Sequence, residues 1–220
     1  RKHNLVNICK NSLGEMDTIS SVPIADCFQK IIQLVKCHIH VAQYSTDSTK
    51  NITEALKLVD SVNIDLFQLE TKSLLYAYKG YLHAHLGNLA DANRAFTFAI
   101  DACDNSAKTW GLYGEYIENV FIQNPKVFAS SSLLAMTCFL HASRDLNEIK
   151  ARKYIAKIIW LLTYEDLRSE MLKTLENYML GVPILNWIPW MPQLFNALIN
   201  YDGDTFMNLL NQIAKVFPQA

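Results

Sequence analysis

A group of five residues with small or aromatic side chains occurs twice in the chain. The two copies are Tyr76, Gly80, Ala92, Phe96 and Ala99, and then Trp110, Gly114, Ala135, Phe139 and Ala142. The first two members return after 34 positions and the last three after 43, so the second copy holds nine additional residues. A period of this length is typical of chains that are built from stacked supersecondary units.

The residue types of the group suit two helices that pack closely. Helix axes in contact lie about 8–10 Å apart, and the side chains between them limit the approach. Glycine inside a helix costs about 0.5–1 kcal/mol relative to alanine. Because Gly80 and Gly114 occupy the same place in both copies, we interpret them as positions where a partner helix comes near. Phe96, between two alanines on one face, would fill the remaining volume.

The spacing is typical of tetratricopeptide repeats, in which each unit is one helical hairpin. We therefore predict an all-α fold, an α-solenoid of antiparallel helical hairpins, with its best repeats at about 70–104 and 106–144. We expect residues 1–220 to be one part of a helical-repeat domain. The chain has no polar capping repeat at either end and no starting methionine, which indicates a fragment of a much larger protein with apolar surface at both ends.

Composition agrees with this fold class and limits the function. The chain has only 7 glycines and 6 prolines in 220 residues, which favours long helices over many short strands. A net charge of −1 gives no long-range field for nucleic acid or an anionic membrane. Five cysteines without a C-x-x-C pair argue against a disulfide framework and a zinc knuckle, and they fit a reducing compartment.

Apolar residues at helical spacing predict further helices. The expected elements are a helix from near Pro23 to Tyr44, a loop over 45–51, a short helix over 52–62, and an antiparallel pair over 147–163 and 166–180. In the short helix, Ala55, Val59 and Val62 would be a degenerate earlier copy of the repeated group.

The boundaries of the repeats carry their own signals. Asp65 and Gln68 are expected to form a capping box before the helix that carries Gly80. Gly87 and Asn88 should end that helix and cap the next one. We expect the nine additional residues of the second repeat to form a longer connection over 122–130, which contains Pro125.

Residues 177–201 contain no charged side chain, so a membrane span has to be considered. Three prolines and several amide side chains in this stretch argue against one, because uncompensated polar groups are costly in hydrocarbon. We expect a buried helix with a proline-rich entry. Trp187 and Trp190 would share a face of it with Leu194. We interpret the tryptophans as an internal wedge between hairpins, and an exposed partner site is the alternative.

Residue pairs that could carry chemistry are weak candidates for a site. His38 with His40, and His83 with His85, stand two apart on helices and cannot chelate one ion together. Cys138 with His141 could share a face but lacks further ligands. Two acidic pairs, Asp101 with Asp104 and Glu115 with Glu118, could suggest acid–base work, although solvated helix faces are the simpler interpretation. A basic stripe could contact phosphate or an acidic partner, or could simply be solvated, and comprises Lys150, Arg152, Lys153 and Lys157.

Segments along nearly the whole chain resemble one family, in the same order. They include RKHNLVN at 1–7, SVPIADCFQK at 21–30, VKC at 35–37, CFLHA at 138–142 with the following residues to 162, GVP at 181–183, WIPWMPQL at 187–194, LLNQI at 209–213 and VFPQA at 216–220. These segments are similar to the FAT region of the pseudokinases related to phosphatidylinositol 3-kinases. The similarity is weakest over 45–72 and 163–177.

The resemblance implies a tetratricopeptide-like scaffold in a coactivator of SAGA-like histone acetyltransferase complexes, in the nucleus. The implied partners are subunits of those complexes, transcription activators, neighbouring helical repeats and the kinase-like domain of the same chain, without direct nucleic-acid or membrane binding. No phosphate loop, catalytic-loop Asp with a following Asn, or Asp-Phe-Gly motif occurs here. The resemblance therefore assigns no catalytic, cofactor-binding or metal residue and no cofactor, and we expect no enzyme.

The alternative is a free-standing tetratricopeptide adaptor that grips a peptide in a concave groove. The expected groove positions are Ala77, Tyr81, Gly111 and Glu115. Adaptors that hold a terminal carboxylate usually line this groove with Lys and Asn, so these residue types favour the scaffold.

Overall fold

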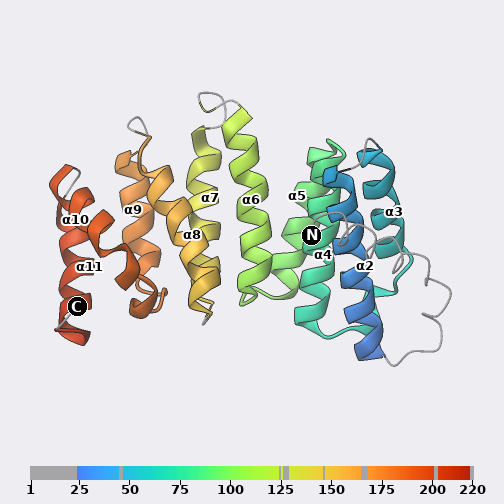
Figure 1. Ribbon diagram of the computed structural model, residues 1–220, viewed down its shortest axis with the longest axis horizontal. Helices are drawn as coiled ribbons and strands as arrows, with labels where there is room; N and C mark the ends of the chain where they lie inside the picture. Colours follow the sequence, from blue (N-terminus) through green and yellow to red (C-terminus); the bar gives the residue numbers. More distant parts are fainter. Residues whose placement is uncertain are drawn as a thin grey trace. The chain divides into compact units, whose positions relative to one another are not determined.

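The chain folds into α-helices joined by short turns in the computed structural model (Figure 1). The structure describes residues 24–44, 47–123, 125, 129–145, 147–164, 168–200 and 203–218. Within these ranges there are ten α-helices and no strand. The predicted all-α class, built from helical hairpins, is confirmed.

Two compact units make up the chain, Arg1–Ser106 and Ala107–Ala220. The helices of the first unit are α2 (Ile24–Tyr44), α3 (Ser48–Asp60), α4 (Leu69–His85) and α5 (Leu89–Ala102). The helices of the second unit are α6 (Ala107–Gln123), α7 (Ala129–Ala142), α8 (Glu148–Leu161), α9 (Arg168–Met179), α10 (Met191–Asn200) and α11 (Gly203–Val216).

In the first unit, α4 and α5 form a hairpin whose helices meet at Gly80. A Cβ atom added to Gly80 would lie 2.8 Å from Cδ2 of Phe96, closer than real Cβ atoms come. The ring of Phe96 is fully buried together with Ala92 and Ala99. The glycine therefore provides the space that the aromatic ring fills, as the sequence predicted.

The hairpin of α6 and α7 in the second unit repeats this contact. A Cβ on Gly114 would lie 2.7 Å from Cε1 of Phe139 and 3.1 Å from Cβ of Cys138. Ala135, Phe139 and Ala142 are fully buried. An aromatic pair recurs as well, because Tyr76 contacts Phe98 and, at the equivalent positions, Trp110 stacks on His141.

The nine additional residues of the second hairpin are mostly helical, which corrects the expected loop over 122–130. Helix α4 continues five residues beyond Gly80, whereas α6 continues nine beyond Gly114. Seven residues of α5 precede Phe96, whereas ten residues of α7 precede Phe139. The connection itself grows only from 86–88 to 124–128. The insertion therefore adds about one turn to each helix, since a turn takes 3.6 residues.

The turns around α4 show which capping predictions are right. The capping box is wrong, since the Gln68 side chain makes no cap hydrogen bond and Asp65 instead pairs with Lys72 at 2.6 Å. Gly87 ends α4 with φ +79, and the N–H of Asn88 donates to the carbonyl of His83. Asn88 precedes α5, but its side chain makes no cap hydrogen bond.

The two earlier helices, α2 and α3, agree with expectation in part. Helix α2 ends at Tyr44 as predicted, while Pro23 lies outside the described residues. Helix α3 begins at Ser48, so residues expected to be loop are helical. Ala55 and Val59 are buried like their counterparts in the repeated group, whereas Val62 lies beyond the helix and is half-buried.

Helices α8 and α9 do not form the expected antiparallel pair, because each packs mainly on α7. The turn after α9, Ile184–Asn186, is bonded to the segment that follows α7. The side-chain amide of Asn186 donates to the carbonyl oxygens of Ser143 and Asp145, at 3.0 and 3.3 Å. Ser143 and Asp145 lie within three residues after α7, so these bonds satisfy backbone carbonyls just beyond the end of that helix.

The uncharged stretch is broken into separate elements. Two 3-10 turns, Ile184–Asn186 and Ile188–Trp190, lie between α9 and α10. Trp187 is buried, as expected, and Trp190 is half-buried, but the two do not lie on one α-helix. Among the described side chains of α10, only those of Leu194 and Ala197 are buried, so the predicted buried helix is wrong.

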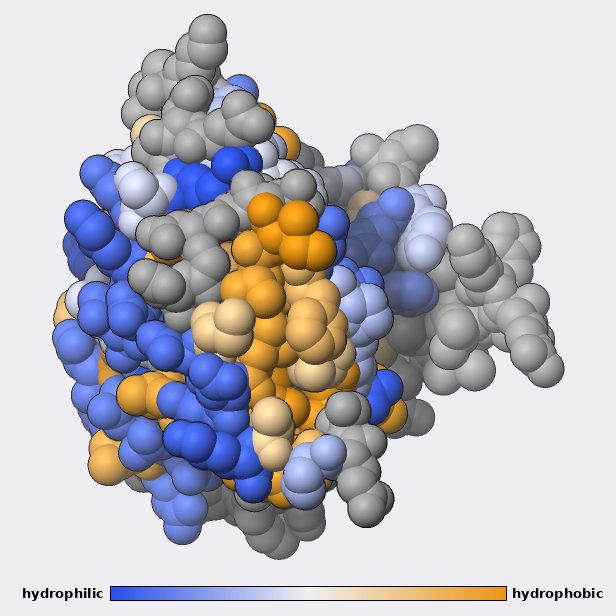
Figure 2. Space-filling view, turned by 90° about the vertical axis from the view of Figure 1, so that its left-hand side faces the viewer, coloured by the Kyte–Doolittle hydropathy of each residue, from blue (hydrophilic) through white to orange (hydrophobic). Residues whose placement is uncertain are grey.

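The outer face of the hairpin formed by α10 and α11 is apolar. Figure 2 shows a stripe of apolar side chains on this side of the molecule. Its exposed members on α10 include Phe195 and Ile199, and those on α11 include Met207 and Val216. No helix among the described residues is long and apolar enough to cross a membrane.

Replacing Gly80 with alanine tests the close contact of α4 and α5. Alanine favours a helix, but overpacking a core contact outweighs this gain, so we expect a net loss of about 1–2 kcal/mol in the free energy of unfolding. Urea denaturation of the 220-residue chain measures this loss. In a Phe96→Leu background the ring is absent, and Gly80→Ala should then be neutral or stabilising; an equal loss in both backgrounds contradicts the contact.

Replacing Trp187 with alanine tests the burial of its ring. Because the ring is 1% exposed, truncation should cost about 3–5 kcal/mol. A thermal melt of the chain measures this, with Trp160→Ala, at a more exposed tryptophan, as the matched control. Equal melting temperatures for Trp187→Ala and the unmodified chain would show that the ring contributes nothing to the core.

Candidate functional site

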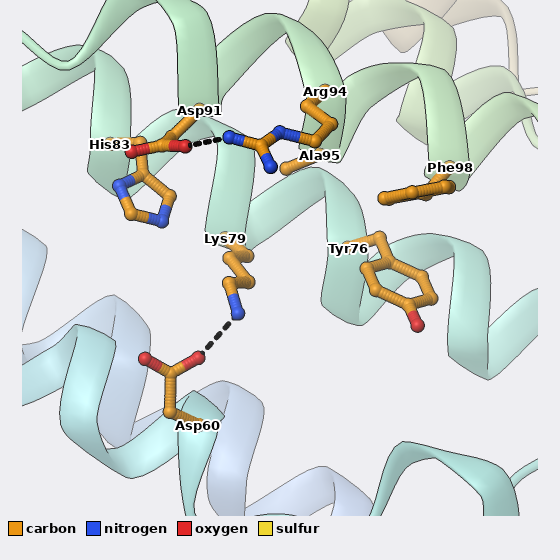
Figure 3. A pocket seen from close by; sticks show the side chains of 8 residues that line it. All are labelled: Asp60, Tyr76, Lys79, His83, Asp91, Arg94, Ala95 and Phe98. Carbon is orange, nitrogen blue, oxygen red and sulfur yellow. Dashed lines mark hydrogen bonds and ion pairs between the residues drawn. The ribbon is translucent and has the colours of Figure 1, made fainter.

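A pocket of about 340 Å³ opens in the first unit between α3, α4 and α5 (Figure 3). Helix α3 contributes its last residue, and α4 and α5 contribute residues about one turn apart. The lining residues are Asp60, Tyr76, Lys79, His83, Asp91, Arg94, Ala95 and Phe98.

One side of the pocket is apolar and the other is charged. The rings of Tyr76 and Phe98 contact each other, with centroids 5.8 Å apart. On the charged side, Lys79 Nζ donates to Asp60 Oδ1 at 2.6 Å, which links α4 to α3. Arg94 donates to Asp91 at the same distance within α5. Figure 3 shows both ion pairs on one side of the space and the two rings on the other.

His83 adds a polar atom that has no protein partner. Its Nδ1 is buried and makes no hydrogen bond within the described part of the chain. A buried polar atom without a partner is unfavourable. The two cations of the pocket, Lys79 and Arg94, are each paired with a carboxylate, so the charges of its lining balance. Such a site is suited to binding and contains no evident nucleophile with its base.

The histidines singled out in the sequence lie in packing contacts. His38 is buried, and this burial lowers its pKa, while His40 contacts the ring of Tyr44. Burial also lowers the pKa of His85, whose ring contacts Tyr81. Among the described residues, no group of three or more His, Cys, Asp or Glu side chains is arranged to hold a metal ion.

Cys138 and His141 also serve the packing of their hairpin. Cys138 is buried against Gly114, and burial raises the pKa of its thiol. The thiol therefore stays protonated, which disfavours reactivity and metal binding. The ring of His141 contacts Trp110, at 4.4 Å between centroids, and Tyr178 of α9, at 5.4 Å.

The acidic pair on α6 and the basic stripe on α8 are partners of each other. Lys153 forms an ion pair with Glu115, and Lys157 forms one with Glu118. The pairs join two helices. The solvated-face interpretation is wrong for Glu118, which is 8% exposed, whereas Lys153 remains 56% exposed. The remaining carboxylates, Asp101 and Asp104, are exposed. Lys150 lies 3.8 Å from Asp145, and Arg152 is exposed.

The expected groove positions are largely covered by the chain itself. Ala77 is fully buried. A Cβ on Gly111 would overlap the phenol of Tyr154 from α8, and Glu115 is held by Lys153. Burial, followed by the charge of Glu115, raises the pKa of Tyr154 to about 12, so this phenol is neutral. Tyr81 packs on His85. These positions offer little support for a clamp that holds a terminal carboxylate.

Two pocket residues stand out in the sequence, Tyr76 as a member of the repeated group and His83 as one of a histidine pair, but nothing in the sequence predicts the pocket itself. One signal was available in the repeat. Phe98 lies 43 positions before His141, the same offset as the last three members of the repeated group, so both could be expected to lie beside the aromatic residue of their hairpin. The residues Lys79, Asp91 and Arg94 gave no signal. Their role depends on the end of α3, which is distant in the sequence.

Removing the carboxylate of Glu118 tests whether its pair with Lys157 supports the second unit. The Glu118 side chain is only 8% exposed, against 23% for Glu115. A hydrogen bond to a charged group contributes about 1.5–3 kcal/mol when shielded, and an exposed ion pair about 0.2–1 kcal/mol. Urea denaturation should therefore show a larger loss for Glu118→Ala than for Glu115→Ala. The reverse order would contradict the assigned burial.

Comparisons with known proteins place the chain in a family. The model of the FAT domain family matches residues 1–160. The chain is 41% identical over 220 residues to "Transcription-associated protein 1" of Drosophila melanogaster and 38% identical to "Transformation/transcription domain-associated protein" of Homo sapiens. It is 29% identical to "SAGA complex/NuA4 acetyltransferase complex subunit Tra1" of Schizosaccharomyces pombe.

Each of these matches covers 100% of the chain but only 6% of the relative. The chain therefore spans a small part of the length of these proteins. The similarity to the FAT region that the sequence segments indicated is confirmed, and it extends over the described helices of both units. The chain belongs to the FAT domain family.

Proposed function

We propose that this chain is a non-catalytic scaffold segment of a transcription coactivator in a SAGA-like histone acetyltransferase complex. The observation that carries the proposal is the match of the whole chain to relatives that include a named acetyltransferase complex subunit. The proposal includes activator recruitment, packing around a kinase-like domain of the same protein, and a place in the nucleus.

The internal contacts of the chain support a structural role. The side chains that could carry chemistry are used between helices. Cys138 packs beside Phe139 at Gly114, and Glu115 and Glu118 pair with lysines of α8. Residues used in this way hold the hairpins in fixed positions. A rigid helical repeat presents large surfaces to other proteins, which suits a scaffold.

The free-standing adaptor is less well supported. Two of its four expected groove positions, Gly111 and Glu115, are covered or paired by side chains of α8. A peptide bound there would have to displace Tyr154 and Lys153. None of the four expected groove positions is itself a cation that could bind a terminal carboxylate.

Affinity purification of the intact protein from nuclear extract, followed by mass spectrometry, tests the scaffold. We expect acetyltransferase subunits to copurify with the intact protein. A Gly114→Leu variant should lose part of this assembly, because leucine cannot fit against Phe139. A variant at the exposed Lys50, Lys50→Ala, is the matched control. Recovery of the intact protein without any acetyltransferase component would contradict the proposal.

A further inference from the structure

We draw no further inference here: the strongest candidate, the exposed apolar stripe on the hairpin of α10 and α11, carries no proposal because nothing in the structure shows what covers it.

Discussion

The close approach of two helices at a glycine is the contact on which both units depend. Phe96 occupies the space that a side chain on Gly80 would need, and Phe139 does the same at Gly114. The alanines on either side of each phenylalanine are fully buried, so the helices remain near along the whole contact. Any larger residue at either glycine would force a buried ring to move, which a close-packed core resists.

The other interactions extend this arrangement to neighbouring helices. In the second unit, α8 contributes Tyr154 to the surface of α6 at Gly111 and two lysines to its glutamates. Asn186 connects the turn after α9 to the end of α7. In the first unit, Lys79 links α4 to the end of α3 and thereby forms one wall of the pocket. The same ion pair therefore serves both packing and the candidate site.

Much of the fold could be predicted because small residues at regular spacing are typical of a close contact between two helices. Gly80, Ala92 and Phe96 have few other reasons to recur at fixed spacing. Local signals were weaker: Asp65, expected in a capping box, is held by Lys72 instead. The spacing also could not distinguish an inserted loop from two added helical turns. The pocket could not be predicted, because Asp60 and Lys79 meet only after α3 and α4 pack.

The most direct measurement of the central claim is an experimental structure of the intact protein at a resolution that shows side chains. The account predicts that the ring of Phe96 lies against Gly80 and that the ring of Phe139 lies against Gly114. A structure in which either glycine faces solvent, with its phenylalanine packed elsewhere, would contradict it.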